Sequence, residues 1–391
     1  MNVTFILGNG FDLNCGLRSS YNDVIKEYTQ HSTTDRGLEN PAVERFKRKI
    51  EEDISKDSKL WSDFECGMAE ELPKFNSERD FIACVQDFKV YLNEYLIKEQ
   101  RRIDTIISGS PELSRQVEKE IAYSVVSFYE GISRNVTRSI EHKLTQSAIV
   151  YNFLSFNYTT FAEKYISKVF KERPSQVEKN LYIMMNQIPP NGDVAQLGAI
   201  QHIHDVLEEN QNEYCKLILG MDNESQLNQP RYQISNILRR AFLKPYYNKI
   251  NDNEKMQRVK ELIDSSSVIC AFGASFGESD LMWKEKILEW LSRDADNHLF
   301  FYMYDYSVLE RSPEKSEDWK MEQEEEGKKK WAEQFGIDLD SSEMQRIERQ
   351  VHIPIGKNIF NVKKLIEQHA LMQSCQKERE QLSTTLPLTT E

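Results

Sequence analysis

The segment FILGNGFDLNCG, residues 5–16, constrains the fold more than any other part of the sequence. The apolar run Asn2–Leu7 that leads into it is typical of a short buried strand. A glycine turn between such a strand and a helix lets backbone N–H groups point at an anion, with help from the helix dipole. A carboxylate such as Asp12 is expected in a phosphate loop only where it meets a ribose hydroxyl or caps a helix. The segment therefore predicts either a nucleotide-binding loop or a tight turn that binds nothing.

Two common phosphate-binding motifs do not match this loop. No Gly-Lys-Ser/Thr follows it, as a P-loop requires. Gly8 and Gly10 fit the dehydrogenase fingerprint, but Leu13 stands where that fingerprint has its third glycine. The loop alone does not identify a ligand.

Short apolar strands alternate with helices in much of the remaining chain. Strands are predicted at residues 148–156, 181–185, 200–204, 216–219, 267–272 and 299–304. Helices are predicted at residues 21–29, from about 160, and at 232–244, 254–262 and 279–291, with Ser19 or Ser20 as the cap of the first. This alternation favours an α/β fold, a Rossmann-like parallel sheet with helices on both faces. Residues 351–355 and 358–362 are predicted to form a last hairpin.

Residues 40–145 differ from this pattern because they are charged, poor in glycine and apolar at three- and four-residue spacing. We therefore predict an α/β nucleotide-binding domain made of residues 1–39 and 146–370, interrupted by a large all-helical insertion at 40–145. The charged run 312–330 is predicted to be a solvated helix or loop. The polar tail, residues 371–391, is expected to be disordered.

Composition narrows the classes of partner. The formal net charge is −13, so nucleic acid is an unlikely partner for a chain without a large basic cluster. The six cysteines are scattered singly, which indicates neither a zinc ribbon nor a disulfide framework and fits a reduced cytosol. No stretch of about 18 apolar residues and no secretory signal are found. We expect a cytoplasmic protein that has no membrane partner.

Two further segments place small or polar residues where predicted strands end, the edge at which open parallel sheets bind ligands. Asn157 follows one strand, where its amide either holds a ribose hydroxyl or water or forms a turn. Gly273, Ser275 and Asp280 follow another strand, where they either approach a ligand or form a capped turn. A ligand that touches both glycine loops must be long, which favours a dinucleotide over a mononucleotide.

The segment QHIHDV allows two kinds of chemistry. On a strand, His202 and His204 would share one face, which is a known arrangement of metal ligands. The alternative is one core histidine and one functional histidine, since a histidine that titrates near neutral pH is a natural general base.

These motifs together resemble the AbiH family of bacterial abortive-infection proteins, which act in phage defence. The resemblance rests on LGNGFDLNCGLRSSYNDVI, LWSDFE, FNYT, HIHD before LILG, and GASFGESD, in that order between Leu7 and Asp280. AbiH proteins are in turn similar to sirtuins, whose sheet binds a nicotinamide dinucleotide. In that comparison the sirtuin Asn-x-Asp motif falls at Asn157, with Thr159 in place of its aspartate, and the catalytic histidine falls at His204. Asp205 stands where both families usually have glycine.

The resemblance implies an NAD glycohydrolase that depletes NAD on phage infection. Asn157 would hold the ribose or water, and His204 would be the general base. The nucleotide would be bound by Gly8, Asn9, Gly10, Phe11, Asp12, Ser19, Tyr21, Gly273, Ser275 and Asp280. NAD or a related nucleotide is the expected ligand, no metal is expected, and the absent paired CxxC zinc module argues against a protein deacylase.

Two alternatives remain open. The same site would serve as a nucleotide-sensing module without catalysis, or His202 and His204 would bind a metal in a hydrolase or nuclease. The helical insertion is expected to regulate access or mediate assembly, either with further copies of the chain or with a phage-derived trigger protein.

Overall fold

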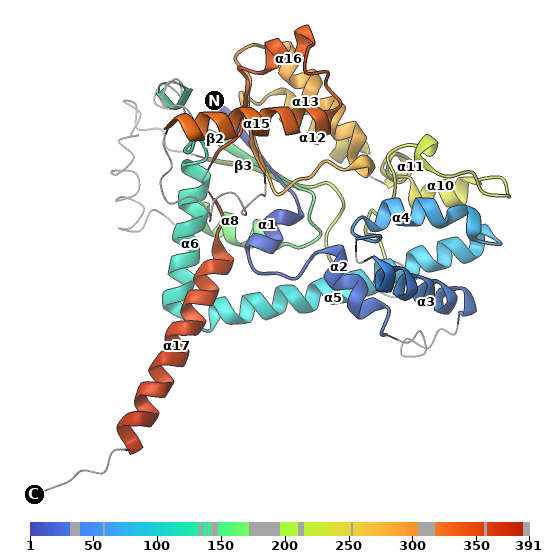
Figure 1. Cartoon of the computed structure of the whole chain (residues 1–391), viewed down its shortest axis with the longest axis horizontal. Coiled ribbons are helices and arrows are strands. Elements are labelled where there is room, and N and C mark those ends of the chain that lie inside the picture. The colour runs from blue at the N-terminus through green and yellow to red at the C-terminus, as the bar shows by residue number, and fades with distance from the viewer. Residues whose placement is uncertain are drawn as a thin grey trace, which may run out of the picture.

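Six parallel strands form the central sheet of the described residues (Figure 1). The computed structural model describes residues 1–31, 40–57, 59–132, 136–138, 140, 142, 148–171, 196–209, 215–251, 253–303, 317–355 and 358–385. The strand order is β3-β2-β1-β4-β5-β6. The strands are β1 (Asn2–Leu7), β2 (Val150–Ser155), β3 (Gln196–His202), β4 (Val268–Phe272), β5 (His298–Tyr302) and β6 (Val351–His352). This is a Rossmann-like order, and its direction reverses between β1 and β4, where such sheets bind ligands.

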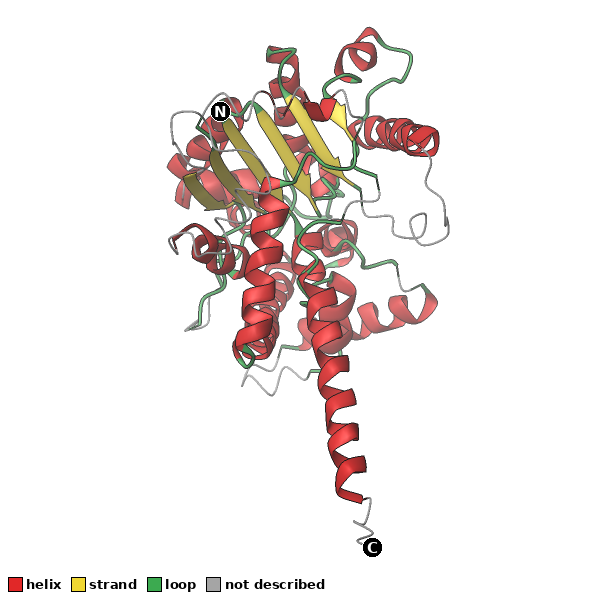
Figure 2. Ribbon diagram, turned by 90° about the vertical axis from the view of Figure 1, so that its left-hand side faces the viewer, coloured by secondary structure: helices red, strands yellow, loops and turns green. Residues whose placement is uncertain are grey.

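Both faces of the sheet are covered by helices, as predicted (Figure 2). Side chains alternate along β1, so that Val3, Phe5 and Leu7 join one core while Ile6 joins another. The first core includes residues of α6 (Pro111–Val126), α8 (Phe161–Lys171) and α17 (Val362–Thr385). The second includes residues of α12 (Asn253–Asp264), α13 (Leu281–Arg293) and α15 (Glu317–Phe335).

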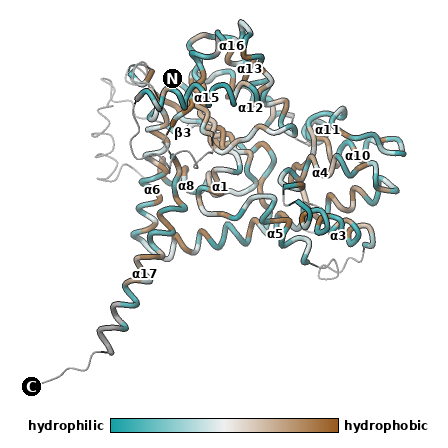
Figure 3. Tube along the Cα trace, in the orientation of Figure 1, coloured by the Kyte–Doolittle hydropathy of each residue, from teal (hydrophilic) through white to brown (hydrophobic). Residues whose placement is uncertain are grey.

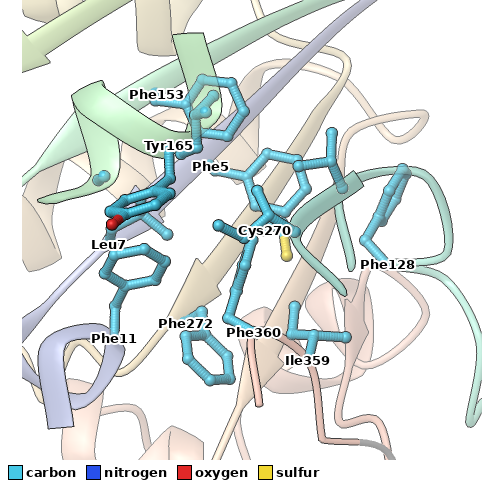
Figure 4. Close-up of a cluster of buried hydrophobic side chains, with 14 of the residues drawn as sticks. Phe5, Leu7, Phe11, Phe128, Phe153, Tyr165, Cys270, Phe272, Ile359 and Phe360 are labelled. Atoms are coloured by element: carbon cyan, nitrogen blue, oxygen red, sulfur yellow. The ribbon is translucent and has the colours of Figure 1, made fainter. Parts of the chain in front are cut away.

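Aromatic rings fill the first core (Figure 4). Phe5 stacks on Phe153 of the neighbouring strand, with ring centroids 5.2 Å apart, and meets Phe128 and Phe360 edge to face. Phe11 meets the same Phe360 ring at 5.1 Å. Since fully buried aromatic side chains contribute strongly to stability, this cluster fixes the glycine loop on the end of the sheet.

The described residues between 40 and 142 are mostly helical, as predicted, but share cores with the rest of the chain. Helices α2 (Tyr21–Tyr28), α3 (Pro41–Lys56), α4 (Phe64–Glu71) and α5 (Glu78–Ser108) form a third core together with buried residues from 215 to 243. The long helix α5 reaches from this core to the sheet, where Ile103 and Ile107 join the first core (Figure 1). Figure 3 shows hydrophobic residues gathered in the strands, while α3 is mostly hydrophilic.

The strand predicted at residues 216–219 is wrong. Leu217 and Leu219 are buried in the third core, but the segment is irregular. Its backbone bonds to separate partners: Ile218 N–H donates to the His204 carbonyl, and Gly220 N–H donates to a Glu65 carboxylate oxygen. A buried apolar run does not by itself distinguish a strand from such a segment.

The C-terminal predictions also need correction. The predicted hairpin is wrong, because only Val351–His352 joins the sheet, parallel to β5, and α17 begins at Val362. The tail expected to be disordered continues α17 as far as Thr385. The predicted helix 232–244 is two helices, α10 (Asn236–Phe242) and α11 (Lys244–Asn251). The predicted strand 181–185 and residues 312–316 lie outside the described residues, and 317–330 belong to α15.

Within the described ranges, no helix combines the length and apolar character that crossing a bilayer requires.

Candidate functional site

The two glycine loops meet at the reversal point of the sheet. Gly8 N–H donates to the Phe272 carbonyl at 3.0 Å, and Gly10 N–H donates to the Gly273 carbonyl at 2.9 Å. A Cβ atom on Gly10 would lie 2.5 Å from the Cα of Gly273, and one on Gly8 would lie 2.4 Å from the Cα of Ala274. These glycines are therefore required by contact between the loops, and two of the donors expected to hold a phosphate are already used.

This contact also removes the argument from ligand length. Because the loops touch each other, even a short ligand can reach both, so their pairing does not favour a dinucleotide.

A cavity of about 310 Å³ lies beside the joined loops. The structure brings most of the predicted site residues to its wall: Gly8, Asn9, Asp12, Ser19, Tyr21, Asn157, His204, Gly273, Ser275 and Asp280. Gly10 lines a separate cavity, and the Phe11 side chain is buried in the first core. Sequence reasoning missed the opposite wall, to which the helical region contributes Ser62, Asp63, Glu65, Leu92 and Leu96.

Asp12 connects the first loop to the Asn157 segment. Asn157 Nδ2 donates to Asp12 Oδ1 at 3.1 Å, and the Thr159 hydroxyl donates to Asp12 Oδ2 at 2.7 Å. Burial raises the pKa of Asp12 to about 7, against the lowering effect of these two hydrogen bonds. The carboxylate beside Asn157 is therefore that of Asp12, from the first glycine loop. The Asn157 amide is therefore held in place by a titratable group.

Asn9 and Ser19 form a second pair at the wall. Asn9 Nδ2 donates to the Ser19 carbonyl at 3.0 Å, and the Ser19 hydroxyl donates to Asn9 Oδ1 at 2.5 Å. Ser20, and not Ser19, caps α2 by accepting from Asp23 N–H.

Lys244, at the start of α11, joins several segments beneath the cavity. Its Nζ donates to the Ser279 carbonyl at 2.8 Å and to Asp280 Oδ1 at 2.9 Å, and lies 3.5 Å from Glu65 Oε2. Burial alone would lower the pKa of Lys244, but the Asp280, Glu65 and Asp222 carboxylates raise it above its ordinary value. Asp280 makes no side-chain cap bond for α13, and its carboxylate instead pairs with this buried cation.

His204 contacts the same cluster. Its Nε2 is buried, lies 3.7 Å from Asp280 Oδ1, and has no hydrogen-bond partner within the described part of the chain. Burial and the nearby Lys244 charge lower the pKa of His204 to about 3, although Asp280 acts in the other direction. The imidazole is therefore neutral at pH 7 and is a weaker base than the sequence led us to expect.

The residues on either side of His204 have separate roles. Asp205 has φ of 65°, in the left-handed region that favours glycine, and its carboxylate accepts from Lys255 Nζ at 2.7 Å. Strand β3 ends at His202, whose Nδ1 lies 3.1 Å from the Asn157 carbonyl oxygen and whose Nε2 lies 3.8 Å from Glu163.

The structure offers the metal interpretation no support. His202 and His204 approach different carboxylates, Glu163 and Asp280. Nowhere in the described ranges do three or more His, Cys, Asp or Glu side chains converge as a ligand set.

The cavity wall is acidic. Four carboxylates line it (Asp12, Asp63, Glu65 and Asp280), and among the described residues no lysine or arginine does. Burial raises the pKa of Glu65 to about 7, because the effect of Lys244 only partly offsets desolvation. Aromatic rings complete the wall, with Phe156 meeting His204 edge to face at 5.4 Å. Lys244 pairs with Asp280, and Asp12 and Glu65 ionise only as the pH rises through about 7, so the negative charge of the wall grows over that range. The ionised wall favours positive charge over phosphate groups inside the cavity.

Comparison with known families adds to this geometry. The family model described as "Bacteriophage abortive infection AbiH" matches residues 4–302. The chain belongs to the AbiH family. The AbiH match includes every residue that lines the acidic cavity, whereas α15, α16 (Ser342–Ile347) and α17 follow it. Among curated proteins, none matches this AbiH chain.

Proposed function

We propose that this AbiH protein hydrolyses the nicotinamide–ribose bond of NAD during abortive infection. Membership of the family assigns the chain to bacteriophage abortive infection. The observation that carries the finer proposal is the acidic cavity at the reversal point of a Rossmann-like sheet.

The charge of the cavity suits this reaction. Nicotinamide in NAD is a pyridinium cation, and breaking its bond to ribose passes through a state with positive charge on the sugar. Carboxylates fixed around that sugar stabilise the transition state more than the ground state, which is the requirement for catalysis. The nicotinamide riboside end would enter the cavity, and the pyrophosphate would stay outside, near the exposed Ser275.

Each of the site residues would have a separate role in binding NAD. Asn157, held by Asp12, would bind a ribose hydroxyl. Nε2 of His204, which has no hydrogen-bond partner among the described residues, would accept a hydrogen bond from the sugar or a water. Phe156 and Tyr158 would pack against the pyridinium ring.

Incubating the purified protein with NAD and measuring released nicotinamide tests this function. We expect nicotinamide and ADP-ribose in equal amounts, with the same rate in the presence of a chelator. Parallel reactions with extract from phage-infected cells supply any activating factor. Absence of nicotinamide under both conditions would contradict the proposal.

A nucleotide sensor without catalysis is the second candidate, and one observation favours it. His204, with a pKa lowered to about 3, is a poor general base at neutral pH. Under this alternative NAD raises the melting temperature of the protein and is recovered intact.

A further inference from the structure

We propose that Glu65, supplied by the helical region, is the general base that activates water in this hydrolysis. The inference rests on the proposed function and assigns its central proton transfer to a residue outside the α/β sheet. Glu65 lies in the first turn of α4, and its side chain reaches the cavity wall opposite the glycine loops. The helical region would thus complete the active site as well as cover it.

The surroundings of Glu65 fix its carboxylate and leave it able to accept a proton. Oε1 accepts from Gly220 N–H at 2.7 Å, and Oε2 lies 3.5 Å from Lys244 Nζ. Each carboxylate oxygen has two acceptor positions, so one position on each oxygen remains for water. The Glu65 side chain is 7% exposed, which keeps bulk water from competing for it.

The other polar groups on the wall are less suited to this role. Asp280 accepts a hydrogen bond from Lys244 at 2.9 Å, which stabilises its ionised form. Asp12 accepts hydrogen bonds from Asn157 and Thr159, so it positions the residue proposed to bind the ribose. The hydrogen bonds to Glu65 come from a backbone N–H and from Lys244, neither of which is given a role on the substrate. His204 is held neutral by burial and by the charge of Lys244.

The surroundings of Glu65 also bring its pKa close to neutral pH. Burial raises its pKa to about 7, and a general base is most effective when its pKa lies near the working pH. The groups that act on it come from several elements: Lys244, Asp280, Asp63, Lys89, Tyr21 and Tyr158.

In the proposed step, a Glu65 carboxylate oxygen takes one proton from water as the water oxygen bonds to the anomeric carbon. The bond from that carbon to the pyridinium nitrogen breaks, and its electron pair stays on the nitrogen, so nicotinamide leaves as a neutral molecule. The proton on Glu65 then passes to solvent. NAD and water thereby give nicotinamide, ADP-ribose and one proton.

The test compares Glu65→Gln with the wild type and with Glu71→Gln. Glu71 lies on the same helix but does not line the cavity, so its variant matches the charge change. We expect Glu65→Gln to lower kcat by about 100-fold or more, with unchanged stabilisation by ADP-ribose. Wild-type kcat should rise with pH to a plateau above about 7, and this rise should be absent in Glu65→Gln. Glu71→Gln should match the wild type.

Glu65→Asp keeps the carboxylate and should retain both a reduced rate and the rise with pH, which tests the role even if Glu65→Gln does not fold. If Glu65→Gln keeps a rate within threefold of the wild type, Glu65 is not the base and the proposed hydrolysis stands. A pH-dependent rise that persists in Glu65→Gln but is lost in Asp12→Asn would assign the base to Asp12 instead. If the wild type itself releases no nicotinamide, both the proposed NAD hydrolysis and the proposed role of Glu65 are wrong.

Discussion

At the scale of single residues, the site depends on carboxyl groups buried beside neutral donors. Asp12 is 2% exposed and accepts hydrogen bonds from Asn157 and Thr159, with no cation partner among the described residues. Because its pKa is about 7 when folded against 3.8 otherwise, the folded chain binds more protons between these values. The free energy of unfolding must therefore fall as pH rises from about 4 to about 7.

Asp12→Asn should remove this pH dependence. The amide keeps an acceptor for Asn157 and places its N–H₂ group against Thr159, while no buried charge forms. We expect the free energy of unfolding of the variant to lose the decline due to Asp12, which is up to about 4 kcal/mol between pH 4 and pH 7. A smaller decline should remain, because Glu65 contributes in the same direction. Urea unfolding at pH 4, 6 and 8 measures the effect. An unchanged slope in the variant would show that Asp12 does not titrate as argued.

A second residue-scale prediction concerns the glycine loops. Gly10→Ala places a Cβ atom 2.5 Å from the Cα of Gly273, so one loop must move, and we expect a loss of about 2–4 kcal/mol in stability. Gly277→Ala is the matched control, because Gly277 lies in the loop after β4 and a Cβ atom there would have its nearest contact at an ordinary 3.5 Å, to Asp63. Thermal unfolding compares the two. Equal melting temperatures would contradict the role given to loop contact.

The sequence allowed part of this site to be predicted. Asp12, Asn157, His204 and Asp280 each follow a strand, or the loop after one, where ligands gather in parallel sheets. Glu65 follows no strand; its only sequence signal was its place in the motif LWSDFE, at the start of the largely buried helix α4, and that motif names no role for it. Only the folded chain brings it to within 3.5 Å of Lys244, which is 179 residues away.

At the scale of secondary-structure elements, Lys244 holds α4, α11 and the segment before α13 together. Lys244→Met should cost about 3–5 kcal/mol, because Asp280 and Glu65 would lose their buried counter-ion. Lys89→Met is the informative control: Lys89 is also buried, donates to the Ala241 carbonyl, and has a pKa lowered to about 8 by burial. We expect that variant to change stability by no more than about 1 kcal/mol. Chemical denaturation measures both free energies of unfolding. Equal losses for the two variants would contradict the role of Lys244 in holding these segments together.

Strands that bury both faces were the elements best predicted. β1, β4 and β5 each lie within two residues of the predicted ends, since continuous apolar runs between helices have few other structures available. Residues 216–219 form a similar apolar run, but they do not pair with a neighbouring strand. Ile218 N–H donates to the His204 carbonyl, and the Ile218 and Lys216 carbonyls accept from the Tyr158 and Tyr247 hydroxyls. The edge strand β6 is only two residues long, too short to show a pattern.

At the scale of the whole molecule, the sheet is built around the first strand of the chain. β1 pairs with β2 on one side and β4 on the other, while its residues enter both cores of the sheet. The helical region is bound to the same unit, because α5 and α6 contribute Ile103, Ile107, Val117 and Ile121 to the first core. A fragment without these segments lacks its central strand and one covering layer.

The fragment 148–391 alone should therefore be molten or insoluble. Without β1, strands β2 and β4 expose unpaired backbone groups, and the apolar residues that faced α6 lose their cover. Co-expression of residues 1–147 with 148–391 is the matched control, since it cuts the chain at the same place but restores the missing strand. We expect near-ultraviolet circular dichroism and a cooperative thermal transition for the two-chain protein, and neither for the fragment alone. A fragment 148–391 that shows both signals would mean that β2 and β4 can close the sheet without β1, and would overturn the single α/β unit argued from its pairing.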